Sequence, residues 1–122
     1  MDLRPFAGNW RTSDPERYVR NAGIVATAPM LGLGSPTIAW TDAALEVLQE
    51  FAGAGYPSRI RERMLIVTPG RDQIVSAAAS GAFANRSAAA SHLMIADAKH
   101  ELLMEQNHYR GQFWSAFDSF AG

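Results

Sequence analysis

Two stripes of hydrophobic residues recur at helical spacing in the first half of the chain. The first stripe is Tyr18, Ala22, Val25 and Ala28, and the second is Trp40, Ala44, Val47 and Phe51. Helix start signals precede both, at Ser13-Asp14-Pro15-Glu16 and at Ser35-Pro36, while Pro29 closes the first and Gly53 follows the second. The pattern predicts two helices, the second of them amphipathic, and we expect the Trp40 stripe to pack in a core.

The second half of the chain changes rhythm. Met64-Leu65-Ile66-Val67-Thr68 is a continuous apolar run stopped by Pro69-Gly70, which is typical of a strand buried on both faces. An alanine-rich helix over 74–84, a second strand over 91–96 and a final helix follow. The final helix is predicted by an aromatic stripe, also expected in the core: Tyr109, Phe113, Phe117 and Phe120.

This order of strand, helix, strand and helix predicts a βαβα unit with parallel strands. Residues 1–13 show no periodicity and are expected to be a connecting segment. Two parallel strands leave unpaired backbone groups at both outer edges, and their faces need cover. We therefore expect a further sheet partner from another chain, from a second copy, or from a longer parent protein.

Composition and charge exclude several classes of function. The chain of 122 residues is 48% hydrophobic and 19% charged, which is typical of globular proteins. Eleven basic and twelve acidic residues give a net charge of −1 without a basic patch, so nucleic acid is not an expected partner. There is no cysteine. No apolar run approaches the roughly 20 residues of a transmembrane helix, and the start lacks the apolar core of a signal peptide. A cytoplasmic location is the default expectation.

Two titratable residues follow the predicted strands. Asp72 comes after the first strand and His100 after the second. Because the carboxyl ends of parallel strands lie at the same edge of a sheet, both loops should emerge together. A carboxylate there can accept the Nδ1 proton of an imidazole that acts as a general base. Taken singly, Asp72 could instead cap the following helix, and His100 could be an ordinary surface residue.

The residues around this pair resemble a known family. Gly70-Arg71-Asp72-Gln73-Ile74-Val75 is similar to the loop that carries the acid in lipases and esterases of the α/β-hydrolase fold. The stretch from Lys99-His100-Glu101 to Phe117-Asp118 resembles the base loop and final helix of the lysophospholipase L2 and monoacylglycerol-lipase-like branch. Upstream, Thr12 to Tyr18 and Gly34 to Trp40 resemble the end of that branch's helical cap and its return to the core.

The resemblance implies an α/β fold that is the C-terminal portion of an α/β-hydrolase. Residues 1–56 would be a helical cap remnant and 57–122 the C-terminal βαβα part of the core. Asp72 would be the acid and His100 the base of a catalytic triad, and Leu31, Leu33 and Trp40 would line an apolar substrate pocket. The implied substrate is a lipid-like carboxylic ester, hydrolysed without a metal or organic cofactor.

The family's nucleophile is a serine in the pattern Gly-x-Ser-x-Gly. The serines of this chain are Ser13, Ser35, Ser58, Ser76, Ser80, Ser87, Ser91, Ser115 and Ser119. None has glycine at both −2 and +2, and the family's oxyanion-hole segment is absent as well. We therefore expect the chain to be inactive alone, with the missing N-terminal hydrolase portion or another copy as its partner.

Two alternatives have their own motivation in the sequence. His92, His100 and His108 are spaced by eight residues, which could suggest a zinc site. They are predicted on a strand, a loop and a helix, where this regular spacing does not bring side chains together around a metal ion, so no metal site is expected. The other alternative is a non-catalytic hydrolase remnant that acts as an association module through an exposed sheet edge.

Overall fold

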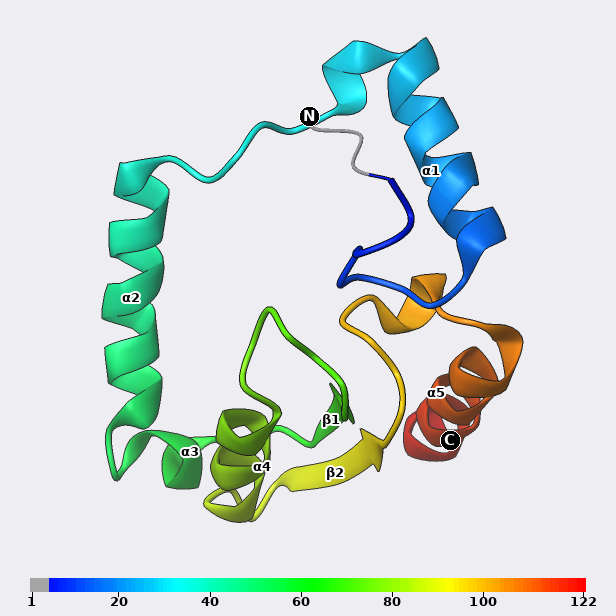
Figure 1. Cartoon of the computed structure of the whole chain (residues 1–122). Helices are drawn as coiled ribbons and strands as arrows, with labels where there is room; N and C mark the ends of the chain where they lie inside the picture. Colours follow the sequence, from blue (N-terminus) through cyan, green and yellow to red (C-terminus); the bar gives the residue numbers. More distant parts are fainter. Residues whose placement is uncertain (1–4) are drawn as a thin grey trace.

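The computed structural model describes residues 5–122, and within them it contains five α-helices and a two-stranded sheet (Figure 1). In chain order the elements are α1 (Pro15–Thr27), the 3-10 turn η1 (Pro29–Leu31), α2 (Ile38–Ala52), α3 (Tyr56–Arg59), β1 (Met64–Pro69), α4 (Ala77–Asn85), β2 (Ala90–Ile95), the 3-10 turn η2 (Leu102–Met104) and α5 (Asn107–Ala121). The mixed α/β class predicted from the sequence is confirmed. The first four residues of the predicted connecting segment lie outside the described residues.

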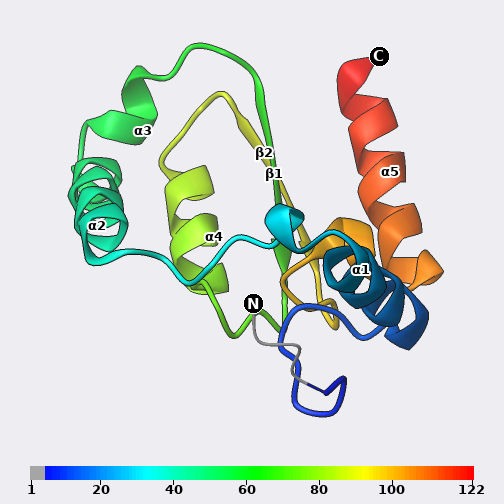
Figure 2. The same ribbon diagram turned by 90° about the horizontal axis from the view of Figure 1, so that it is seen from above.

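The two strands pair in parallel, as predicted. Their register runs from Met64 opposite Ala90 to Pro69 opposite Ile95. The crossover helix α4 lies on one face of the sheet and α5 lies on the other, as Figure 2 shows. Within residues 5–122 the sheet consists of β1 and β2 alone, so each strand has one edge without a strand partner.

The core lies between the sheet and α5. Ile95, Ala98 and Leu102 are buried there, at the end of β2 and in the segment that follows it. The partly buried side chains that pack around them are Val67, Leu93, Tyr109 and Phe113. Two members of the predicted aromatic stripe therefore reach the core, whereas Phe117, one turn further along α5, is largely exposed.

A second cluster, of aromatic rings, joins α2 and α3 to α4. Phe51, Tyr56 and Phe83 have ring centroids 5.0 to 6.4 Å apart. The Arg86 guanidinium donates to the carbonyl oxygens of Phe51 and Ala52 at the C-terminal end of α2. These carbonyls have no partner inside the helix, so a cation there is favourable.

Side-chain caps set the starts of three helices. Asp14, one of the two cap candidates in Ser13-Asp14, caps α1 through the Arg17 amide. Thr37, rather than Ser35, caps α2 through the Trp40 amide. The alanine-rich helix starts at Ala77, capped by Ser76, and not at residue 74. The amides of Ile74 and Val75, which lie before this start, donate to the Asp72 carboxylate.

The prediction that the Trp40 stripe packs in a core is wrong for the described chain. No residue of α2 is buried, and Trp40 is 63% exposed. Periodicity reports which face of a helix is apolar, but a core also requires an element opposite that face. In Figure 1, α2 lies at the outer side of the molecule, with α3 and α4 on its inner side.

The accessible surface is large for a chain of this mass. It measures 8583 Å² for 13.3 kDa. Folded monomers of that mass expose about 6,500 Å², so the excess is roughly 2,000 Å², well above the ~800 Å² that each partner buries in a standard interface.

None of the helices within residues 5–122 is long and apolar enough to cross a membrane.

Candidate active site

The loops that follow β1 and β2 are joined by backbone hydrogen bonds. The Gly70 amide donates to the Ile95 carbonyl at 2.8 Å, and the Arg71 amide donates to the Ala98 carbonyl at 2.9 Å. Gly70 lies so close to the second loop that a Cβ would come within 2.1 Å of the Ala96 oxygen. Only glycine allows this approach, which brings Asp72, two residues further on, to the loop that carries His100.

Asp72 uses both oxygens of a buried carboxylate. Its side chain is 1% exposed. Oδ1 accepts hydrogen bonds from the amides of Ile74 at 2.8 Å and Val75 at 3.1 Å, and Oδ2 lies 2.8 Å from Nδ1 of His100. The two amides orient the carboxylate so that its second oxygen faces the imidazole.

These contacts keep Asp72 ionised. Burial by itself raises the pKa of Asp72, but the hydrogen bonds from His100 and from the amides of Ile74 and Val75 outweigh it, so that the pKa lies below its ordinary value of 3.8. Asp72 is therefore an acceptor at neutral pH, and Nδ1 of His100 must carry the proton that it shares with Oδ2.

His100 has the geometry of a general base. With Nδ1–H held by Asp72, the neutral ring has Nε2 as its proton acceptor, and the side chain is 33% exposed. A carboxylate on Nδ1 fixes the tautomer and stabilises the imidazolium that forms when Nε2 takes a proton. The sequence expectation that Asp72 and His100 meet at one edge of the sheet is met by this contact, although their catalytic roles stay a prediction.

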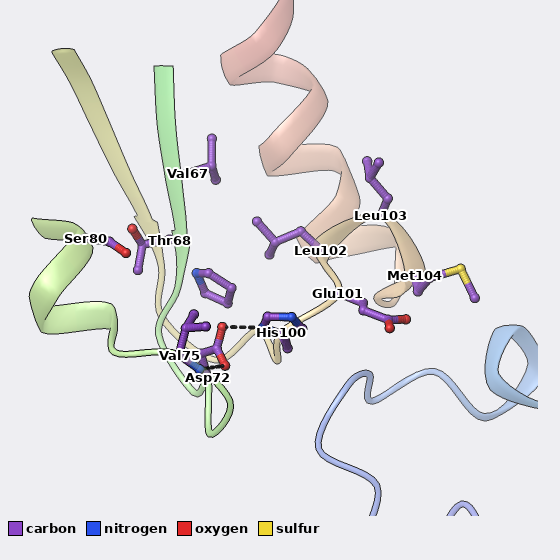
Figure 3. A pocket seen from close by; sticks show the side chains of 11 residues that line it. Val67, Thr68, Asp72, Val75, Ser80, His100, Glu101, Leu102, Leu103 and Met104 are labelled. Atoms are coloured by element: carbon purple, nitrogen blue, oxygen red, sulfur yellow. Dashed lines mark hydrogen bonds and ion pairs between the residues drawn. The ribbon is translucent and has the colours of Figure 1, made fainter. Parts of the chain in front are cut away.

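A cavity of about 470 Å³ opens beside the pair (Figure 3). Its lining is mostly apolar and comes from the C-terminal end of β1, the loop after it, α4, and the segment from His100 to Met104. The lining residues are Val67, Thr68, Pro69, Asp72, Val75, Ser80, His100, Glu101, Leu102, Leu103 and Met104. A few polar groups in an otherwise apolar hollow are typical of small-molecule sites.

The predicted pocket residues lie elsewhere. Leu31, Leu33 and Trp40 are 63%, 86% and 63% exposed, and none of them lines this cavity. They belong to η1, the following loop and α2, which the described chain leaves without cover on that side. Their role in a substrate pocket stays a prediction that depends on a partner segment.

Ser80 is the serine that lines the cavity. It lies on α4, and in Figure 3 it stands across the cavity from His100, with Thr68 and Val75 between them. Its hydroxyl donates to the Ser76 carbonyl at 3.4 Å within the helix. Ser80 thus has the environment of an ordinary helical serine and not that of a nucleophile on a tight turn.

Sequence reasoning missed the apolar lining and a buried carboxylate. Leu102, Leu103 and Met104 begin two residues after His100, so this apolar run after the predicted base was the available signal. Glu105 is 0% exposed and binds the segment before α1 as well as the His100 loop. No local pattern signals this role, because its partner Ser13 is 92 residues away in the sequence.

The described residues offer no metal site. Within residues 5–122 there is no group of three or more His, Asp or Glu side chains that could hold a metal ion. His92 makes a different contact, since its Nε2 lies 2.9 Å from the Thr68 hydroxyl.

Comparisons with protein families, curated proteins and solved structures found nothing that matches this chain.

Proposed function

We propose that this chain supplies the acid and the base of a serine ester hydrolase of the α/β-hydrolase type, and that the serine belongs to a partner segment. The observation that carries the proposal is the hydrogen bond of 2.8 Å between the buried Asp72 carboxylate and Nδ1 of the partly exposed His100. Both residues stand on loops that follow parallel strands, in the chain order acid and then base.

The chemistry follows from this pair. A serine hydroxyl placed at Nε2 of His100 gives up its proton as its oxygen attacks the ester carbonyl. The imidazolium, stabilised by Asp72, returns that proton to the departing alcohol oxygen. Water then cleaves the acyl-enzyme by the same route, with His100 taking a proton from water and returning it to the serine oxygen.

The character of the cavity favours an apolar ester as substrate. Val67, Val75 and Leu102 line it beside His100. An acyl chain would bury its methylenes there at about 0.8 kcal/mol each. Together with the resemblance to lysophospholipases and monoacylglycerol lipases, this lining supports a lipid-like carboxylic ester.

Three observations support a partner segment. The outer edge of β1 has no strand partner within residues 5–122. Trp40 and Val47, in the apolar stripe of α2, are 63% and 45% exposed, and the accessible surface exceeds that of a compact monomer of this mass by roughly 2,000 Å². A segment that adds strands at β1 and covers α2 would satisfy all three and could carry the serine.

Reconstitution tests the proposal. The chain would be produced alone, and together with the polypeptide encoded immediately upstream of Met1, either fused or as a separate chain. We expect hydrolysis of p-nitrophenyl esters only with both parts present. Asp72→Asn should lower the rate by about 10⁴-fold, and His100→Ala should lower it at least as much. Asp97→Asn, an exposed carboxylate in the same loop, should leave the rate unchanged.

Two outcomes would contradict the proposal. One is ester hydrolysis by the 122-residue chain alone that disappears in His100→Ala, because the serine would then belong to this chain. The other is a folded assembly of both parts with no hydrolysis of short or long acyl esters, since the pair would then have no ester-cleaving role.

The uncovered surface favours a second candidate, a non-catalytic association module that pairs through the β1 edge. Sedimentation velocity of the purified chain tests whether it associates through this edge. Self-association at micromolar concentration, together with unchanged assembly of His100→Ala and Asp72→Asn, supports the module. A compact monomer at all concentrations counts against pairing driven by this edge.

A further inference from the structure

Glu105 is a fully buried carboxylate that no step of the proposed reaction uses. Its side chain accepts four hydrogen bonds. Oε1 accepts from the Lys99 amide at 2.8 Å, and Oε2 accepts from the Ser13 amide at 3.1 Å, the Ser13 hydroxyl at 2.5 Å and the Gln106 amide at 3.1 Å. A buried carboxylate needs this many donors because it has lost its water.

The donors to the carboxylate are amides and a hydroxyl. The Arg17 guanidinium donates to the backbone carbonyl of Glu105 at 2.9 Å, and its ion pair is with the Asp14 carboxylate. The carboxylate of Glu105 is therefore a hub for backbone groups, with one oxygen on the His100 loop and the other on the start of α1.

The other side of His100 is tied to the same region. The Glu101 amide donates to the Arg11 carbonyl at 2.7 Å. The Lys99 ammonium donates to the Asn9 carbonyl at 3.0 Å, and the Thr12 hydroxyl donates to the Met104 carbonyl at 2.6 Å. We call residues 9–13 the N-terminal clasp. The amides of both residues adjacent to His100 are thus held, that of Lys99 by Glu105 and that of Glu101 by the clasp directly.

We propose that Glu105 is a positioning residue for His100. By accepting the Lys99 amide it sets the backbone from which the imidazole projects, so that Nδ1 faces Oδ2 of Asp72. By accepting Ser13 it couples that geometry to the last residue of the N-terminal clasp, so that a displacement of Ser13 is transmitted to the acid–base pair. The consequence for catalysis rests on the proposed function, whereas the positioning itself does not.

The physical reason is the reach of a carboxylate with two oxygens. A glutamine has one acceptor oxygen, so its NH₂ group would face either the Lys99 amide or the donors of Ser13 and Gln106. An aspartate keeps the charge but is one methylene shorter and does not span both segments. Glu105→Gln and Glu105→Asp therefore disturb the same hub in different ways.

The test is ¹⁵N NMR of the histidine side chains in the full 122-residue chain, which needs no catalytic activity. In the wild type we expect the neutral His100 ring to hold its proton on Nδ1, with a slowly exchanging Nδ1–H signal. Glu105→Gln and Glu105→Asp should lose that signal and shift the ring toward the Nε2–H tautomer. The Lys99 amide should exchange about tenfold faster or more in both variants.

Thr12→Val is the matched comparison. It removes two hydrogen bonds from an equally buried position, the one that the Thr12 hydroxyl donates to the Met104 carbonyl and the one that it accepts from the Asp14 amide. The donors of Glu105 are not themselves replaced. A purely structural role for Glu105 predicts that all three variants lower stability and leave the His100 tautomer as in the wild type. A positioning role predicts that Thr12→Val keeps the Nδ1–H signal while both Glu105 variants lose it.

Retention of the wild-type Nδ1–H signal in a folded Glu105 variant overturns the proposal. If neither variant folds, the proposal is tested on the wild type, by following the His100 Nδ1–H signal and the protection of the Lys99 amide through a series of urea concentrations. The Nδ1–H signal of His100 should vanish together with protection of the Lys99 amide, and its survival after that protection is lost overturns the proposal. Failure of ester hydrolysis in the reconstituted enzyme would leave these NMR results unaffected, so the two proposals fail separately.

Discussion

Gly70 lies directly against the backbone of Ala96, so closely that a Cβ on Gly70 would be 2.1 Å from the Ala96 oxygen and 2.7 Å from its carbonyl carbon. This contact brings the ends of the two strands together and allows the Gly70 and Arg71 amides to bond across to the second loop. Asp72 is the next residue, so the approach of two backbones sets the distance between the acid and the base.

Substitution of Gly70 by alanine should therefore separate the two loops. We expect Gly70→Ala to lower the free energy of unfolding by about 1–3 kcal/mol, the usual cost of overpacking, because the clash is with backbone and not with a flexible side chain. Urea denaturation measures the loss. The distance between the loops can be followed by the His100 Nδ1–H signal, which should weaken in parallel.

Gly111 provides the comparison for this substitution. It lies within α5, and a Cβ there would meet nothing within 4 Å. Gly111→Ala should raise the free energy of unfolding by about 1 kcal/mol, the difference in helix propensity. Equal effects of the two glycine substitutions would show that the Gly70 contact does not hold the loops together.

Replacing the acid tests its effect on the base. Asp72→Asn keeps an oxygen for the amides of Ile74 and Val75 but removes the charge that faces His100. We expect the neutral His100 ring to move from the Nδ1–H to the Nε2–H tautomer, as measured by the ¹⁵N chemical shifts of the neutral ring. Asp97→Asn should leave the tautomer unchanged, and a shift in both variants would contradict a specific role for Asp72.

The same carboxylate should make stability depend on pH. The pKa of Asp72 in the folded chain lies below its ordinary value of 3.8. Its contribution to the free energy of unfolding is therefore fully present above about pH 4 and is lost as the pH falls through the folded-state value. In urea titrations between pH 6 and pH 2, the stability difference between the wild type and Asp72→Asn should shrink toward the acid end.

The pKa of Asp14 is also lowered from its ordinary value, so a separate variant is needed to distinguish its contribution to acid sensitivity from that of Asp72. The Arg17 amide lowers the pKa of Asp14, with its burial acting in the opposite sense and the Arg17 charge adding to the decrease. Asp14→Asn should remove this second acid-labile contribution while retaining the one from Asp72. A constant difference between the wild type and Asp72→Asn at every pH would contradict the lowered pKa of Asp72.

The two apolar regions should respond very differently to truncation. Ile95 is 1% exposed in the core, so Ile95→Ala should cost about 2–5 kcal/mol of unfolding free energy. Trp40 is 63% exposed, so Trp40→Ala should change the stability of the isolated chain by less than about 0.5 kcal/mol. Chemical denaturation of both variants gives the comparison. A loss above 2 kcal/mol in Trp40→Ala would mean that α2 is covered in solution.

Several parts of the fold could be predicted because they depend on local order. Helical spacing and the Asp14 cap indicated α1, and the apolar run stopped by Pro69-Gly70 indicated β1. A helix between two strands implied their parallel pairing, which the register of β1 and β2 bears out. The start of α4 was predicted too early, at residue 74 instead of Ala77, where Ser76 caps the helix.

The sequence by itself determined the mixed α/β class and the positions of Asp72 and His100 directly after the two strands. Only the tertiary structure decided that their side chains meet, that Glu105 joins the His100 loop to Ser13, and that Trp40 of α2 stays exposed. The reason is the range of the interactions. Strand and helix periods arise from neighbouring residues, whereas these contacts join residues 28 and 92 positions apart, or need an element that packs opposite.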